Sequence, residues 1–155
     1  MSFLPFLLLL HLVGLAAFLG GAFAQQQFMR MSSREGLAAA IRDEYERLSA
    51  AIVTKVEVPA LFAQILTGLA VIVLQPYLLA QHWLHAKLTA VVLLLVLSHL
   101  EMFNARRLVR ARQARGDAAA DEIATRKKRH ALFGAMGTVL VVAVLVLATV
   151  LRGVM

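Results

Sequence analysis

The residues with the clearest chemical potential lie in a hydrophobic stretch from residue 82 to residue 106. Lys87 and His99 lie within its apolar run, and His85 lies near its start. An ionisable side chain at mid-depth in a membrane costs roughly 2.5–3.5 kcal/mol on insertion scales, so such residues usually face a protein interior and have a partner there. We therefore expect this stretch to contribute a functional group to the inside of a helical bundle.

A second candidate, His11, lies in the apolar stretch near the N-terminus. With a rise of about 1.5 Å per residue, His11 lies about 12 Å and Lys87 about 5 Å below the outer surface. The inner half of the membrane is expected to hold four further polar side chains: Glu57, His99, Glu101 and Arg106. Two structural alternatives stay open. The amine of Lys87 can reach the outer headgroups, and His99 can be a packing residue with satisfied hydrogen bonds.

The composition is that of an integral membrane protein. Of the 155 residues, 61% are hydrophobic, whereas soluble domains average about 45–50%. Each apolar stretch is long enough to cross a hydrocarbon core about 30 Å thick. We predict an all-α four-helix bundle forming one transmembrane domain over residues 1–155. The expected spans are about 3–28, 56–79, 84–104 and 131–151, and the polar connections are 30–55 and 105–130.

The basic residues predict how the chain is oriented. The two polar connections hold five and nine of the 16 Lys and Arg residues. Because cytoplasmic loops are enriched in Lys and Arg, both connections are expected in the cytoplasm and both termini outside. This topology accounts for the net charge of +7, so we expect membrane lipids rather than nucleic acid as the partner.

Two local patterns predict structure around these spans. Small residues recur every four positions at Ala16, Gly20 and Ala24, and at Ala17 and Gly21, which favours close packing against another helix or against a flat ligand such as a porphyrin. Ser32-Ser-Arg-Glu35 has the form of a capping box, and a short amphipathic helix is expected after it. A break is expected at Gly116.

The candidate ligands limit the cofactors. The chain has no cysteine, which excludes disulfides, iron–sulfur clusters and covalent c-type haem. His11 and His99, on different membrane helices, suit the axial positions of b-type haem, and arginines at a membrane face such as Arg106 suit its propionates. A zinc or copper site would need three or four ligands at similar depth, which the sequence does not show.

These residues also resemble a known family. Trp83-Leu-His-Ala-Lys87-Leu, followed by His99, resembles the third span of the HemJ family, the protoporphyrinogen IX oxidases of bacterial haem synthesis. Two further segments are similar to the family's first and second spans: Leu10-His11-Leu-Val-Gly14, and Val58-Pro59-Ala60 through Gly68. The resemblance covers roughly residues 5 to 105.

The resemblance implies a multi-pass protein of the bacterial inner membrane that binds haem b, with His11 as an axial ligand. Lys87, with the haem, would then handle the porphyrinogen substrate or its protons. The implied reaction is the six-electron oxidation of protoporphyrinogen IX to protoporphyrin IX, with a quinone-like electron acceptor. His99, and less directly His85 and Arg106, complete the expected cofactor site.

The first and last spans depart from the family pattern. Phe18 and the glutamines at 25–27 stand where the family has a tryptophan and an arginine. The closing span reads Leu132-Phe-Gly-Ala-Met136 in place of an Asn-Glu-x-Pro motif. Three interpretations follow: an oxidoreductase, a non-catalytic haem-binding or accessory subunit, and a cofactor-free small membrane protein. The sequence also leaves open a homo-oligomer or a larger membrane complex.

Overall fold

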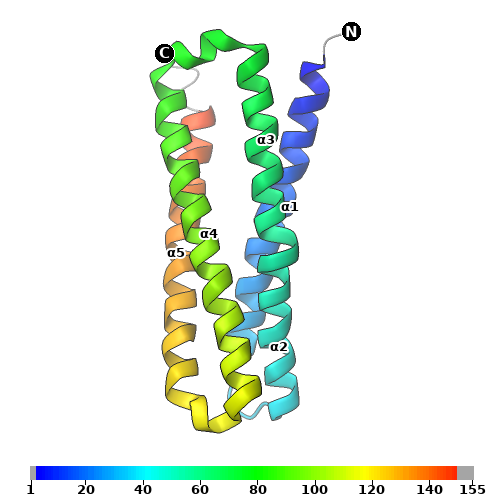
Figure 1. The fold of residues 1–155 in the computed structure, drawn as a ribbon, viewed down its shortest axis with the longest axis vertical. Helices are drawn as coiled ribbons and strands as arrows, with labels where there is room; N and C mark the ends of the chain where they lie inside the picture. The colour runs from blue at the N-terminus through cyan, green and yellow to red at the C-terminus, as the bar shows by residue number, and fades with distance from the viewer. Residues whose placement is uncertain (1–2, 150–155) are drawn as a thin grey trace.

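The chain folds into a bundle of long helices, as the computed structural model of the protein shows for residues 3–149 (Figure 1). No β-strand occurs among these residues, so the all-α prediction is confirmed. The helices are, in chain order, α1 Leu4–Met31, α2 Ala39–Ile52, α3 Val58–Leu74, α4 His82–Arg115 and α5 Ala120–Thr149. A π-helical turn, η1 Val53–Glu57, joins α2 to α3 without a break, so that the two form one rod.

Proline and glycine set several helix boundaries. Pro5 and Pro59 lie in the first turns of α1 and α3, where a missing N–H leaves no bond unmade. Pro76 disfavours helical backbone at Gln75, and α3 ends at Leu74, before the 3₁₀ turn η2 Pro76–Ala80. Gly116 ends α4 with a φ of 52°, a conformation that favours glycine, which confirms the predicted break.

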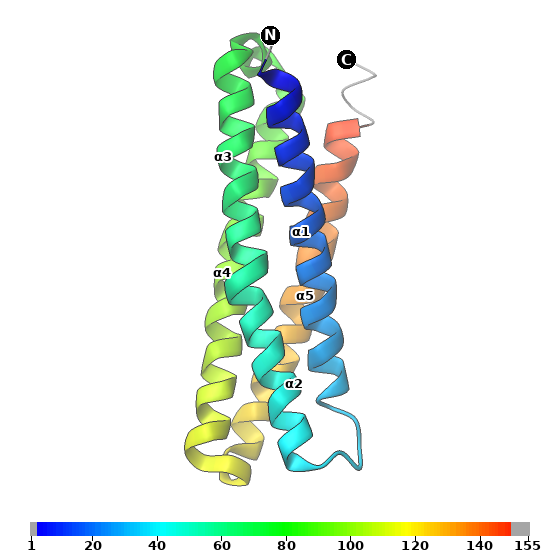
Figure 2. The same cartoon turned by 90° about the vertical axis from the view of Figure 1, so that its right-hand side faces the viewer.

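Three stretches are long and apolar enough to cross a membrane: Leu4–Met31, Ala39–Leu74 and His82–Thr149. The last stretch comprises α4 and α5, which fold back on each other at the 3₁₀ turn η3 Gly116–Ala119 (Figure 2). α5 packs mainly on α4, and α1 packs mainly on α3. Several apolar helices therefore form the body of the molecule.

The polar connections contain more helix than predicted. α4 continues past the predicted span to Arg115, and α5 begins at Ala120. The expected amphipathic helix is α2, but the capping box is wrong: α2 starts at Ala39 without a side-chain cap. The reason is that α1 extends to Met31, so the Ser32 hydroxyl instead donates to a carbonyl of the last turn of α1 at 2.8 Å.

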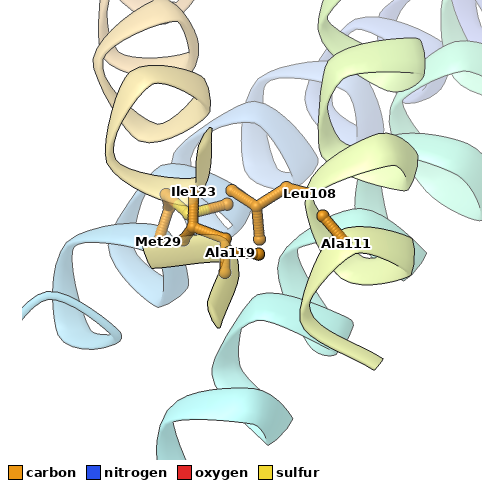
Figure 3. Close-up of a cluster of buried hydrophobic side chains, with 5 residues drawn as sticks. All are labelled: Met29, Leu108, Ala111, Ala119 and Ile123. Atoms are coloured by element: carbon orange, nitrogen blue, oxygen red, sulfur yellow. The ribbon is translucent and has the colours of Figure 1, made fainter. Parts of the chain in front are cut away.

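Apolar side chains are buried in separate clusters along the bundle. The middle cluster consists of Phe18, Ala60, Leu61 and Leu94. A second cluster, at the end opposite η2, joins α1, α4, η3 and α5 through Met29, Leu108, Ala111, Ala119 and Ile123 (Figure 3). A third joins η1, α3 and α4 through Val53, Val58 and Met102.

The predicted small-residue contact forms at only one of two neighbouring glycines. A Cβ added to Gly21 would lie 3.5 Å from the backbone nitrogen of Glu57, so α1 approaches η1 closely there. A Cβ on Gly20 would meet nothing within 4 Å. Gly14, seven residues before Gly21, also approaches α3, at Gln64. Seven residues are close to two helical turns, so the contact follows this spacing rather than the four-residue repeat.

An ion-pair cluster joins α2, α4 and α5 at the end of the bundle where the apolar cluster of Figure 3 lies. The Glu46 carboxylate is 1% exposed and lies 2.8 Å from the Lys127 ammonium and 3.2 Å from the Arg112 guanidinium. Its hydrogen bonds to the guanidinium raise the pKa of Arg112. These charges explain why the helices continue here, since each inward-facing charge has a partner.

Candidate functional site

His11 and Lys87, two of the predicted site residues, lie within electrostatic range of each other. His11 is half-buried on α1, and its Nδ1 lies 2.9 Å from the hydroxyl oxygen of Thr67 on α3. Gly68 lies beside the imidazole, since a Cβ there would be in van der Waals contact with the ring at 3.6 Å. Lys87, on α4, is within electrostatic range of His11.

The other predicted site residues do not gather with them. His99 donates from Nδ1 to the carbonyl of Leu95 at 2.8 Å, and its ring meets Phe62 edge-on. His85 is exposed and bonds a carbonyl of the η2 turn at 2.8 Å. Arg106 is exposed and donates to a threonine hydroxyl of η1 at 3.3 Å. Each of these three side chains has a local partner.

A different set of residues lines a cavity of about 580 Å³ in the half of the bundle away from η2. Residues of α1, η1, α4 and α5 line it, and none of the five predicted site residues is among them. One part of its wall is apolar. The buried or half-buried polar side chains of the wall are those of Gln25, Gln26, Gln27, Glu57, Ser98, Glu101, Lys127 and His130.

Glu101 is the best-supported carboxylate on this wall. Its Oε1 accepts hydrogen bonds from the side-chain amides of Gln25 at 2.8 Å and Gln26 at 2.9 Å. The same oxygen lies 3.5 Å from Nδ1 of His130. The amide of Gln26 occupies the space beside Gly134 where a Cβ would otherwise lie. The glutamines of α1 are therefore part of this site.

Glu57 and His130 are buried with unsatisfied polar atoms. Glu57 is 2% exposed; one carboxylate oxygen accepts from the Ser98 hydroxyl at 3.4 Å, and Oε2 has no hydrogen-bond partner. His130 is 0% exposed, and neither ring nitrogen has a hydrogen-bond partner. Leaving a polar group buried and unsatisfied costs roughly 1–3 kcal/mol. Two such side chains on one cavity wall require an explanation.

The backbone at Glu57 is also unusual. Glu57 is the last residue of η1, the π-helical turn between α2 and α3. Such turns are rare and are frequent at functional sites. Ser98 and Glu101 are three residues apart on α4 and thus share a face. Because Glu57 is bonded to Ser98, it lies within electrostatic range of Glu101. The arrangement brings two carboxylates from different helical segments together at the cavity.

The sequence alone gave Glu57 and Glu101 no role and did not single out His130 as a candidate. A usable signal was present in α5. His130 lies seven residues after Ile123, and these two are the buried residues of α5 among those described. The spacing of two turns puts His130 on the inward face, despite the basic residues that precede it.

Among residues 3–149, no group of three or more His, Asp or Glu side chains could hold a metal ion. The comparisons with other proteins bear on family only. The profile of a family described as "Predicted integral membrane protein (DUF2269)" matches residues 5–152, and nothing in that match points to HemJ. No curated protein and no solved structure matches the chain.

Proposed function

We propose that the chain, which belongs to the DUF2269 family of predicted integral membrane proteins, binds a small molecule within the membrane. The binding site is the cavity that α1, η1, α4 and α5 line, and the binding groups are Glu57, Glu101 and His130. The observation that carries this proposal is the burial of unsatisfied atoms of Glu57 and His130 on one cavity wall. Ionisable residues inside membrane proteins commonly mark substrate pathways, and a ligand that bonds these atoms would offset the free energy of burying them.

The proposed topology has four crossings and both termini outside. Its support is the reversal of the chain at Gly116, which makes α4 and α5 two antiparallel helices rather than one span. The charge distribution supports the orientation, because the polar connections 30–55 and 105–130 hold most of the Lys and Arg residues. In this arrangement the cavity lies in the cytoplasmic half of the membrane.

Reaction with a lipid-soluble carbodiimide tests the site without knowledge of the ligand. Dicyclohexylcarbodiimide enters the membrane and forms a stable adduct with protonated carboxyl groups that it can reach. We expect an adduct at Glu57, found by peptide mass spectrometry, and its loss in Glu57→Gln. Glu44→Gln is the matched control, since Glu44 is exposed on α2 and pairs with Arg47. Absence of the adduct in membranes, when the same protein opened in SDS reacts, would refute the proposal.

Haem b at His11 is a second proposal, which one observation favours. Histidines that ligate metals usually bond a second group through the other ring nitrogen, and the contact of Nδ1 with Thr67 leaves Nε2 for iron. Haem would supply redox chemistry, and Lys87 would hold a proton near it, as the resemblance implies. His99 is less suited to be a ligand of the same haem. Its ring packs against Phe62, which lies five residues from Thr67, the partner of His11, on α3. A Soret band that His11→Ala abolishes would support this proposal.

A further inference from the structure

We infer that the ligand of the cavity is a lipophilic organic cation, an apolar molecule with one positive charge, which the carboxylates of Glu57 and Glu101 hold. This inference rests on the proposed function and names the class of ligand that the site takes. It follows from the charges on the cavity wall, from the apolar part of that wall, and from the side on which the cavity opens.

The two carboxylates of the wall are not paired with its two basic side chains, Lys127 and the exposed Arg30. Among residues 3–149, no ion pair joins a lysine or arginine to Glu57 or Glu101. Lys127 lies at the cavity, but its ammonium is engaged by Glu46 at 2.8 Å and by Ser32 at 2.9 Å. His130, whose Nδ1 lies 3.5 Å from Glu101, is a cation only when protonated. A buried carboxyl group keeps its proton unless a cation pairs with it, so a positive ligand would replace that proton and complete this site.

The remaining wall is suited to an apolar body. It includes the buried side chains of Phe18, Leu94 and Leu97. Phe23, on α1, is 67% exposed and also lines the cavity, as does the exposed Val142 on α5. The cavity therefore opens sideways between α1 and α5, where lipid would surround the protein. A molecule that partitions into the membrane could enter there, and an aromatic ring can interact favourably with a cation.

Other ligand classes satisfy fewer of these features. An anion would be repelled by the two carboxylates, and a neutral lipid would leave them without a counter-charge. A metal ion needs several oxygen or nitrogen ligands, and the described residues 3–149 hold no group of three His, Asp or Glu side chains arranged for one. The apolar wall would also be unused by a bare ion. Only a cation with an apolar body uses both halves of the cavity.

The experiment uses tetraphenylphosphonium as the probe and the full-length protein in lipid nanodiscs. We expect saturable binding, measured by scintillation proximity with the radiolabelled probe. Glu57→Gln and Glu101→Gln should each weaken binding at least about tenfold, whereas the exposed Glu44→Gln should leave it unchanged. Triphenylphosphine oxide, a neutral molecule with similar aromatic rings, should compete poorly. Each variant is first checked for monodisperse elution and wild-type helicity.

A cavity-filling variant covers the case in which a glutamine variant does not fold. Val141→Trp enlarges a half-buried side chain of the α5 wall, and we expect it to abolish probe binding with both carboxylates intact. Failure of the cation inference and failure of the proposed binding site would give different experimental results. If carbodiimide modifies Glu57 but tetraphenylphosphonium does not bind, or the neutral molecule competes equally, the cavity stands and the ligand class is wrong. If carbodiimide leaves Glu57 unmodified, the proposed site itself is wrong.

Discussion

Replacing Glu46 by glutamine tests the electrostatics of the bundle most directly. Glutamine keeps the size of the side chain and one carbonyl oxygen, but it removes the negative charge between Lys127 and Arg112. These two cations have side chains only 17% and 11% exposed, so little water is available to replace the lost anion. The variant should therefore be less stable than the wild type.

The magnitude follows from what remains around each cation. Removing one partner of a buried ion pair typically costs roughly 3–5 kcal/mol. Arg112 would keep Asp43 at 3.3 Å and Asp117 at 3.4 Å, but both are exposed and screened by water. Lys127 would keep, among the residues that the structure describes, only its bonds to Ser32. We therefore expect a loss near the lower end, about 3 kcal/mol.

The assay is reversible unfolding by SDS in mixed micelles, followed by circular dichroism. The matched control is Glu44→Gln, the same substitution two residues earlier on α2, where the carboxylate is exposed and bonds only Arg47. We expect that variant to unfold at the wild-type SDS fraction. A double-mutant cycle with Arg112→Met would isolate the Glu46–Arg112 term. Equal stability of the two glutamine variants would show that the buried ion pairs contribute nothing to the fold.

Three further predictions follow from the structure. Gly21→Leu should force α1 away from η1 and lower the free energy of unfolding by about 1–3 kcal/mol through overpacking. The control is Gly20→Leu, which should not lower it because the adjacent Gly20 faces open space. Equal effects of the two variants on the unfolding midpoint would contradict the assigned contact. The chain has no cysteine, so single cysteines can be labelled to test the proposed orientation. Gln81→Cys should react with an impermeant maleimide in intact cells, and Asp117→Cys should react only after lysis. The reverse pattern would show that the orientation is inverted. If haem co-purifies, His11→Ala should remove the Soret band, and an unchanged band would assign the iron to another ligand.

The local features of the fold were predictable because adjacent residues determine them. A run of apolar residues specifies a membrane helix, and Pro59 and Gly116 mark boundaries through their own backbone restrictions. The length of α4 was not predictable in this way. Its last turns are stabilised by contacts with α2 and α5, including the pairing of Arg112 with Glu46, and that pairing depends on how the rods assemble.

The composition of the site was less predictable than the position of each residue along its helix. His99 and Glu101 lie at nearly the same depth, but two residues along a helix correspond to a rotation of about 200°. Glu101 therefore lines the cavity while His99 turns toward Phe62 of α3. A sequence gives the depth of each side chain directly, whereas the inward direction of each helix is fixed only by its neighbours. For this reason the sequence does not distinguish the glutamate that lines the cavity from the histidine that does not.

The two polar regions of the bundle are separated by apolar side chains, which limits what binding alone can achieve. His11 and Thr67 lie on the η2 side, and Glu57 lies on the other side. Between them Phe18 and Leu61 are buried in the middle cluster, and a charged ligand or a proton would lose its hydration on crossing that layer. The haem proposal and the cation proposal can therefore fail independently, since they concern different sites. It also follows that a cation bound at Glu57 is not transported unless the helices rearrange, so transport would require a second conformation in which the Phe18 layer opens.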